Sequence, residues 1–77
     1  MTVTLYTQAG CGMCREAEAM LRRIGGKIRF ALVIVDIDAD SSAHAKYWDR
    51  IPVITVDGEE VAAAPLNERH LASALRR

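Results

Sequence analysis

The sequence has 77 residues, 51% of them hydrophobic, and its 10 basic and 10 acidic residues give a formal net charge of +0 at pH 7. This length predicts one small domain over residues 1–77, and the balanced charge excludes the basic surplus expected of a protein that binds nucleic acid or an anionic membrane. The longest apolar run, residues 30–35, is far shorter than a membrane span, and the first residues lack the features of a signal peptide, so we expect a cytoplasmic protein.

The first half of the chain predicts a strand, a helix and a second strand. Residues 2–7 are rich in β-prone side chains, and this run stops at Ala9-Gly10. From Gly12 onwards apolar residues recur at helical spacing, in a stripe formed by Met13, Ala17, Met20, Leu21 and Ile24. Residues 27–37 contain an almost continuous apolar run, which predicts a central strand covered on both faces. Because a helix separates the two strands, we expect them to lie parallel.

The second half predicts a short helix, a β-hairpin and a final helix, over residues 43–49, 53–63 and 68–76. Asp57-Gly58 is a strong signal for the two-residue turn of the hairpin, and Asn67 is a suitable N-cap for the last helix. We interpret Tyr47 and Trp48 of the short helix as core residues rather than as part of a substrate groove. The order βαβαββα predicts an α/β fold with a four-stranded mixed sheet and helices on both faces.

Cys11 and Cys14 form a C-x-x-C pair at the predicted junction of the first strand and the first helix. A disulfide between them would close a very short loop and stabilise the fold little, so we favour a chemical role over a structural one. At a helix start the sulfur of Cys11 faces unpaired N–H groups and the positive end of the helix dipole, which favours the nucleophilic thiolate. Cys14 returns to the same helix face and can resolve a mixed disulfide. Gly12 leaves the approach open, and Met13 offers a pliable apolar contact to a partner.

Ile51-Pro52 is the second candidate part of a site. Proline fits the start of a strand because it has no N–H to donate to the sheet. A cis bond at this point would bring the preceding backbone beside the cysteine helix, where the carbonyl and amide of Ile51 could pair with a substrate strand. The residues alone leave the commoner trans form open.

These segments together resemble the thioredoxin superfamily, and in length and layout the chain is most similar to the small glutaredoxin-like proteins. The resemblance covers nearly the whole chain and rests on Cys11-Gly12-Met13-Cys14 after the first strand, on Ile51-Pro52-Val53-Ile54 before the hairpin, and on the closing helix. It implies a thioredoxin-like fold, with Cys11 as nucleophile, Cys14 as resolving thiol, and a cis Pro52 that faces the disulfide. The implied activity is the reduction of protein or small-molecule disulfides, with electrons from a reductase or from glutathione and no cofactor besides the disulfide itself.

The chain departs from the patterns of both families at positions that bind glutathione or move protons. Glutaredoxins typically carry Pro and Tyr between the cysteines, and usually a lysine three residues before the first, where this chain has Gly12, Met13 and Gln8. Their glycine-rich turn after the hairpin is replaced here by residues 62–65, so we expect weak binding of glutathione. Thioredoxins keep a buried carboxylate where this chain has Leu5, which leaves the group that deprotonates the resolving cysteine unidentified.

Two other functions stay open from the residues alone. Cys11 and Cys14 could hold zinc or an iron–sulfur cluster between two subunits, or their oxidation could act as a sensor that changes binding partners. His44 and His70 match no common zinc spacing, and the alternating aspartates of residues 36–40 lack the glycine and glutamate of a calcium loop. We therefore expect a monomer without bound metal that acts on disulfide-containing proteins or small molecules.

Overall fold

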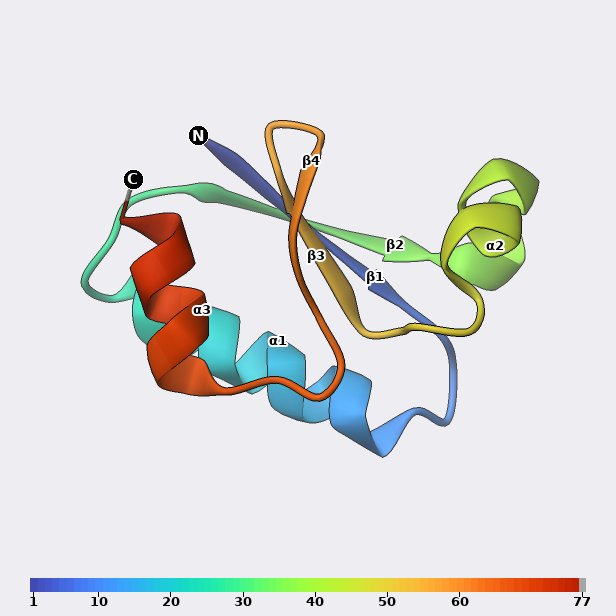
Figure 1. Cartoon of the computed structure of the whole chain (residues 1–77), viewed down its shortest axis with the longest axis horizontal. Coiled ribbons are helices and arrows are strands. Elements are labelled where there is room, and N and C mark those ends of the chain that lie inside the picture. The colour runs from blue at the N-terminus through green and yellow to red at the C-terminus, as the bar shows by residue number, and fades with distance from the viewer. Residues whose placement is uncertain (77) are drawn as a thin grey trace.

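The computed structural model describes residues 1–76, and its elements follow the predicted order βαβαββα (Figure 1). The strands are β1 (Thr2–Thr7), β2 (Ala31–Asp36), β3 (Val53–Val56) and β4 (Glu59–Ala63). The helices are α1 (Gly12–Gly25), α2 (Ser41–Tyr47) and α3 (Glu68–Leu75), and a single 3₁₀ turn, η1 (Ile37–Ala39), lies between β2 and α2. None of the helices in this part of the chain has the length and apolar character needed to cross a membrane.

The four strands form one mixed sheet in the order β2-β1-β3-β4. β1 is parallel to β2 and antiparallel to β3, and β3 and β4 form the predicted hairpin. The prediction that the strand after α1 is central is wrong, because β3 pairs with the other side of β1 and leaves β2 at the edge. Consequently Val33 and Ile34 of β2, which point to opposite faces of the sheet, are 43% and 41% exposed.

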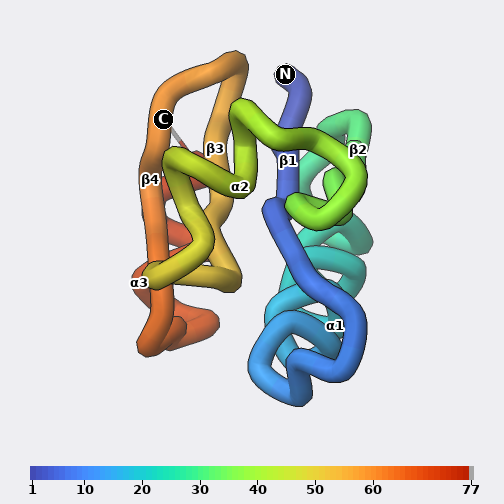
Figure 2. Tube along the Cα trace, turned by 90° about the vertical axis from the view of Figure 1, so that its right-hand side faces the viewer, coloured from blue at the N-terminus to red at the C-terminus, as the bar shows by residue number. Residues whose placement is uncertain are grey.

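The core is divided into two apolar clusters by the sheet. α1 and α3 lie on one side of the sheet, and α2 lies beside the end of β2, as Figure 1 and the turned view in Figure 2 show. The cluster beneath α1 and α3 consists of Val3, Leu5, Ala17, Leu21, Ile24, Ile54, Leu71 and Leu75. The smaller cluster beneath α2 consists of Ile37, Ala43, Tyr47 and Val53. Val53 and Ile54 are consecutive in β3 and belong to different clusters, because successive strand residues face opposite ways.

The aromatic residues of α2 have different environments. Tyr47 is a core residue as predicted, since it is 5% exposed and its ring centroid lies 4.5 Å from that of Tyr6. The same prediction is wrong for Trp48, which is 60% exposed. Consecutive helical residues point about 100° apart, so the residue after the buried Tyr47 is turned away from the sheet.

The turn and cap signals of the sequence are confirmed. Asp57 and Gly58 have φ angles of 49° and 89°, the left-handed conformation that a two-residue hairpin turn of type I′ requires at both positions. The Asn67 side chain caps α3 by accepting a backbone N–H at 3.1 Å, and Asp40 caps α2 in the same way at 3.0 Å.

Thr55 lies in β3 with 1% of its surface exposed, and its Oγ1 has no hydrogen-bond partner among the described residues. A buried hydroxyl without a partner has lost its hydration without compensation. We therefore expect Thr55→Val, which keeps the shape and removes the hydroxyl, to raise the free energy of unfolding in urea by about 1 kcal/mol. The control Thr55→Ser keeps the hydroxyl, loses a methyl group and should be less stable than the wild type. A Val variant less stable than the wild type would contradict this explanation.

Candidate functional site

Cys11 and Cys14 form a disulfide bond at the N-terminus of α1, with their Cα atoms 5.2 Å apart. Cys11 is the N-cap of α1, and its Sγ accepts a hydrogen bond from the backbone N–H of Cys14 at 3.1 Å. A tight turn after β1 positions this residue: its N–H donates to the carbonyl of Gln8 at 3.3 Å, and Gly10 supplies a φ of 80°. The predicted place of the first sulfur at the start of the helix is thus confirmed.

The two cysteines differ in exposure. Cys11 is half-buried, whereas Cys14 is 3% exposed. The buried stripe of α1 consists of Cys14, Ala17, Leu21 and Ile24. The prediction that Met13 belongs to this stripe is wrong, since it is 54% exposed, and the three- and four-residue spacing of the buried positions leads back to Cys14 instead. Cys11 is therefore partly open to solvent, whereas Cys14 is buried behind it.

A groove of about 220 Å³ lies next to the cysteine motif and is lined by Met13, Glu16, Ala17, Met20, Pro52, Ala64, Pro65 and Leu66. Met13 and Pro52, which are far apart in the sequence, therefore line the same depression. The Ile51–Pro52 peptide bond is cis, which confirms the expectation drawn from the resemblance. The groove is mainly apolar, and Glu16 is the one charged residue among the described residues that line it.

Two of the predicted binding residues do not line the groove. Gly12 is exposed, and a Cβ atom added to it would meet no atom within 4 Å, so this position leaves open space beside the disulfide. Ile51 is half-buried, and its side chain packs against the cluster beneath α2. The pairing of its backbone with a substrate strand stays a prediction.

Sequence reasoning missed the wall of the groove formed by residues 64–66 and the contribution of Glu16. The Ala64–Pro65 bond is also cis and lies in the loop between β4 and α3. Pro65 directly after the hairpin was the available signal, because a proline there ends the strand and fixes the direction of the following loop. Gln8, which replaces the usual lysine of glutaredoxins, donates from Nε2 to Asp38 Oδ1 at 2.9 Å.

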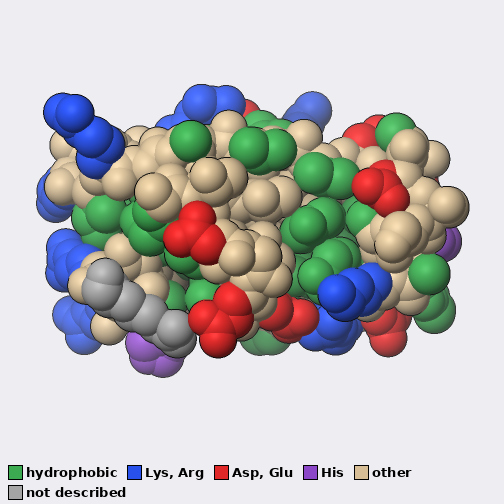
Figure 3. Space-filling view, turned by 90° about the horizontal axis from the view of Figure 1, so that it is seen from above, with side chains coloured by type: hydrophobic (Ala, Val, Ile, Leu, Met, Phe, Trp, Pro, Cys, Tyr) green, Lys and Arg blue, Asp and Glu red, His purple; other side chains and the backbone are tan. Residues whose placement is uncertain are grey.

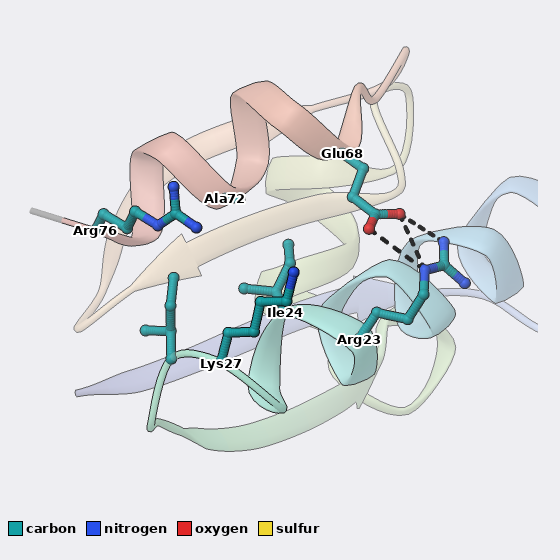
Figure 4. Close-up of a pocket in the computed structure, with 7 residues that line it drawn as sticks. Arg23, Ile24, Lys27, Glu68, Ala72 and Arg76 are labelled. Carbon is teal, nitrogen blue, oxygen red and sulfur yellow. Dashed lines mark hydrogen bonds and ion pairs between the residues drawn. The ribbon is translucent and has the colours of Figure 1, made fainter.

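A second cavity, of about 380 Å³, lies between α1 and α3 at the end of α1 away from the cysteines (Figure 4). An ion pair crosses it, in which Nη2 and Nε of Arg23 donate to Glu68 Oε1 at 2.6 and 3.1 Å. The hydrogen bond from Arg23 holds the pKa of Glu68 below its ordinary value, and the same bond raises the pKa of Arg23. These groups link the two helices and lie apart from the disulfide.

The lowered pKa of Glu68 makes the contribution of this ion pair depend on pH. A carboxylate with a lowered pKa stabilises the fold above its unfolded-state pKa of about 4.3, and that stabilisation is lost as the pH falls through the folded-state pKa. We expect Arg23→Gln to lower the free energy of unfolding slightly at pH 7, because the pair is exposed, and the difference from the wild type to shrink as the pH falls from about 5 to about 3. Urea denaturation at several pH values measures this. If the difference in the free energy of unfolding between wild type and Arg23→Gln were constant with pH, the cause would be helix propensity and not the ion pair.

The side chains that commonly bind metals are not clustered in the described residues. Within residues 1–76, no group of three or more His, Cys, Asp or Glu side chains is placed to hold a metal ion. His44 lies in α2 and His70 in α3, on elements that cover different faces of the sheet.

Comparison with known proteins gives matches in sequence and in structure. A family model described as "Glutaredoxin-like domain (DUF836)" matches residues 2–76. An uncharacterized protein of Mycobacterium tuberculosis is 29% identical over 80 residues, which cover 97% of this chain and 82% of that protein. A structural-genomics target protein from X. campestris is similar with a TM-score of 0.81 and 28% identity, over 96% of this chain and 95% of the other. Fasciola hepatica thioredoxin is similar with a TM-score of 0.70 and 29% identity, over 99% of this chain and 78% of the other. These matches confirm the predicted thioredoxin-like fold.

Proposed function

We propose, since the chain belongs to the glutaredoxin-like domain family (DUF836), that it is a dithiol–disulfide oxidoreductase in which Cys11 is the nucleophile and Cys14 the resolving thiol. The proposed reaction is the reduction of disulfides, with the Cys11–Cys14 pair as the redox group and no further cofactor. The cytoplasm is the proposed location, because a dithiol that reduces other disulfides must itself be kept reduced.

The unequal exposure of the two cysteines is the observation that carries this proposal. A nucleophile must reach a partner, and Cys11 is half-buried at the tip of α1. The resolving thiol must be protected from attack by other disulfides, and Cys14 is 3% exposed. The N–H of Cys14 points at Cys11 Sγ at 3.1 Å, and the positive end of the helix dipole lies at the same place, so in the reduced protein both stabilise a thiolate on Cys11.

The proposed cycle transfers two electrons to the substrate. The Cys11 thiolate attacks one sulfur of the substrate disulfide, the substrate bond breaks, and the leaving thiolate takes a proton from water. Cys14 then loses its proton to solvent and attacks Cys11 Sγ, which releases the second substrate thiol and forms the Cys11–Cys14 disulfide. Two electrons from a reductase, or from two glutathione thiols, regenerate the dithiol. We propose a reducing couple nearer the roughly −270 mV of thioredoxin than the −120 mV of DsbA.

The groove supports protein substrates over glutathione. Met13, Met20 and Pro52 offer an apolar surface that fits a side chain beside a protein disulfide. Glutathione carries two carboxylates, whereas the charged residue of the groove is Glu16, also an anion. Coulomb repulsion with that carboxylate would oppose the binding of glutathione, so it is the weaker substrate in this proposal.

The direct test is turnover with two substrates. The wild-type protein should catalyse the reduction of insulin by dithiothreitol, and it should reduce a glutathione mixed disulfide less well when each is compared with the uncatalysed rate. The pair Cys11→Ser and Cys14→Ser isolates the two sulfurs, and Ala19→Ser on the exposed face of α1 is the matched control. A wild-type rate equal to that of Cys11→Ser on every disulfide tried would refute the proposed activity.

A further inference from the structure

The edge strand β2 has the composition of a central strand. Its sequence, residues 31–36, contains five apolar residues and no lysine or proline, which are the residues that usually protect a sheet edge from pairing. Val33 and Ile34 leave an apolar residue about two-fifths exposed on each face of the sheet.

The outer side of β2 carries backbone groups ready to pair. The N–H of Ala31 donates to the carbonyl of Met1 at 3.0 Å, so Ala31, and with it Val33 and Val35, bond toward β1. By the same alternation the N–H and C=O groups of Leu32 and Ile34 point away from the sheet. Within residues 1–76 no strand pairs with this side.

The two ends of β2 carry opposite charges. Arg29 lies just before the strand, and Asp36 and Asp38 lie at and just after its end. All three are exposed, and among the described residues none of them forms an ion pair within the chain. Lys and Arg side chains gather at the end of the molecule where α1 ends and β2 begins, on the left of Figure 3. An antiparallel copy of the same strand would place each charged end beside its opposite.

We propose that β2 pairs antiparallel with β2 of a second copy of this chain across a two-fold axis at Val33, forming a continuous eight-stranded sheet. In this register Leu32 lies opposite the partner's Ile34, and the outward backbone groups of both form about four hydrogen bonds. Val33 lies opposite the partner's Val33. Arg29, which precedes the strand, lies at the level of the partner's residues 36–38, so oppositely charged strand ends meet on both sides of the axis. The strand then has a neighbour on each side, as its sequence predicts, and the monomer expected from the sequence becomes half of a dimer.

This interface leaves the disulfide groove open. The groove is lined by residues of α1, of the segment before β3 and of the loop after β4, whereas β2 is the opposite edge of the sheet from β4. The proposal is therefore independent of the proposed reaction, and changes at the edge should leave insulin reduction unchanged.

A charge-reversal experiment tests the antiparallel arrangement. Sedimentation velocity of the wild type should show a species of twice the 8.5 kDa chain mass. Arg29→Glu and Asp36→Arg should each raise the dissociation constant at least about tenfold, because each homodimer then juxtaposes like charges. A mixture of the two variants should dimerise more tightly than either variant alone, because residues 29 and 36 again have opposite signs on both sides of the axis in the mixed dimer. A monomeric wild type, or variants that do not associate on mixing, would overturn the proposal.

Cysteine cross-linking tests the register and does not depend on those charges. In a chain whose Cys11 and Cys14 are replaced by Ser, Val33→Cys should form an intermolecular disulfide on mild oxidation, since residues opposite each other at a non-hydrogen-bonded position have Cα atoms about 4.5 Å apart. Ala31→Cys, on the same strand and face, is the matched control. In the proposed register its sulfurs are separated by about four residues of strand, or about 13 Å, and should not join. Equal cross-linking at both positions would refute the register.

Discussion

Cys14→Ser should turn the protein from a catalyst into a covalent trap. Cys11 keeps its place at the helix tip in this variant, so attack on a substrate disulfide proceeds and the mixed disulfide accumulates because no second sulfur releases it. Incubation with insulin or with cell extract, followed by non-reducing electrophoresis and mass spectrometry, should show adducts that dithiothreitol removes. Multiple turnover should fall to the uncatalysed rate.

Cys11→Ser is the matched variant for the trap. It keeps the buried Cys14, which is 3% exposed and therefore should not form adducts with proteins at a comparable rate. Adducts on Cys14 in this variant as abundant as those on Cys11 in the other would reverse the assigned roles. Adducts in neither variant would remove the basis for the exchange reaction.

Leu21→Ala should have the largest effect on stability. Leu21 is 0% exposed and belongs to the cluster in which α1 and α3 meet the sheet. Truncation of a fully buried leucine lowers the free energy of unfolding by about 2–5 kcal/mol, because transfer free energy is lost and a cavity is left. Small domains have total stabilities of about 5–15 kcal/mol, so the loss is a large part of the whole. The midpoint of urea or thermal unfolding measures it.

Met13→Ala on the same helix is the control for this prediction. Met13 is 54% exposed, so its truncation should change the free energy of unfolding by less than about 0.5 kcal/mol. It should instead weaken substrate binding, since Met13 lines the groove. Similar losses of stability in the two variants would contradict the division of α1 into a buried face and a face toward the groove.

Local signals in the sequence predicted the elements well because their causes are local. The turn at Asp57-Gly58 needs two residues that accept positive φ, and the cap at Asn67 needs a side-chain acceptor, and both can be recognised without knowledge of the rest of the fold. The position of β2 depends on which strand takes the other side of β1, a long-range choice that the apolar run of residues 31–35 does not encode. The run was therefore interpreted as central, and the isolated chain places it at the edge.

The site likewise has features that local sequence determines and features that depend on long-range packing. The sulfur at the helix start follows from the spacing of Cys11 and Cys14 and from the strand–helix junction, so it was predictable. The groove wall at residues 64–66 comes close to α1 only when the hairpin and α3 pack on the sheet, and no local pattern reveals that contact. Met13 was assigned to the buried face because its apolar character fits the helical spacing, but Cys14 is as apolar and takes that place.

The two walls of the groove are anchored to the fold in different ways. Cys11 follows β1, which is hydrogen-bonded on both sides, by β2 and β3, and such a strand is among the last parts of a domain to open. Pro65 and Leu66 belong to a connection that leaves the edge strand β4, and connections of this kind adapt their shape more readily than the elements they join. We expect β1 to hold the sulfur of Cys11 in a fixed position and the loop at Pro65 and Leu66 to adjust its shape. The same sulfur would then react with proposed protein substrates whose surfaces differ in shape.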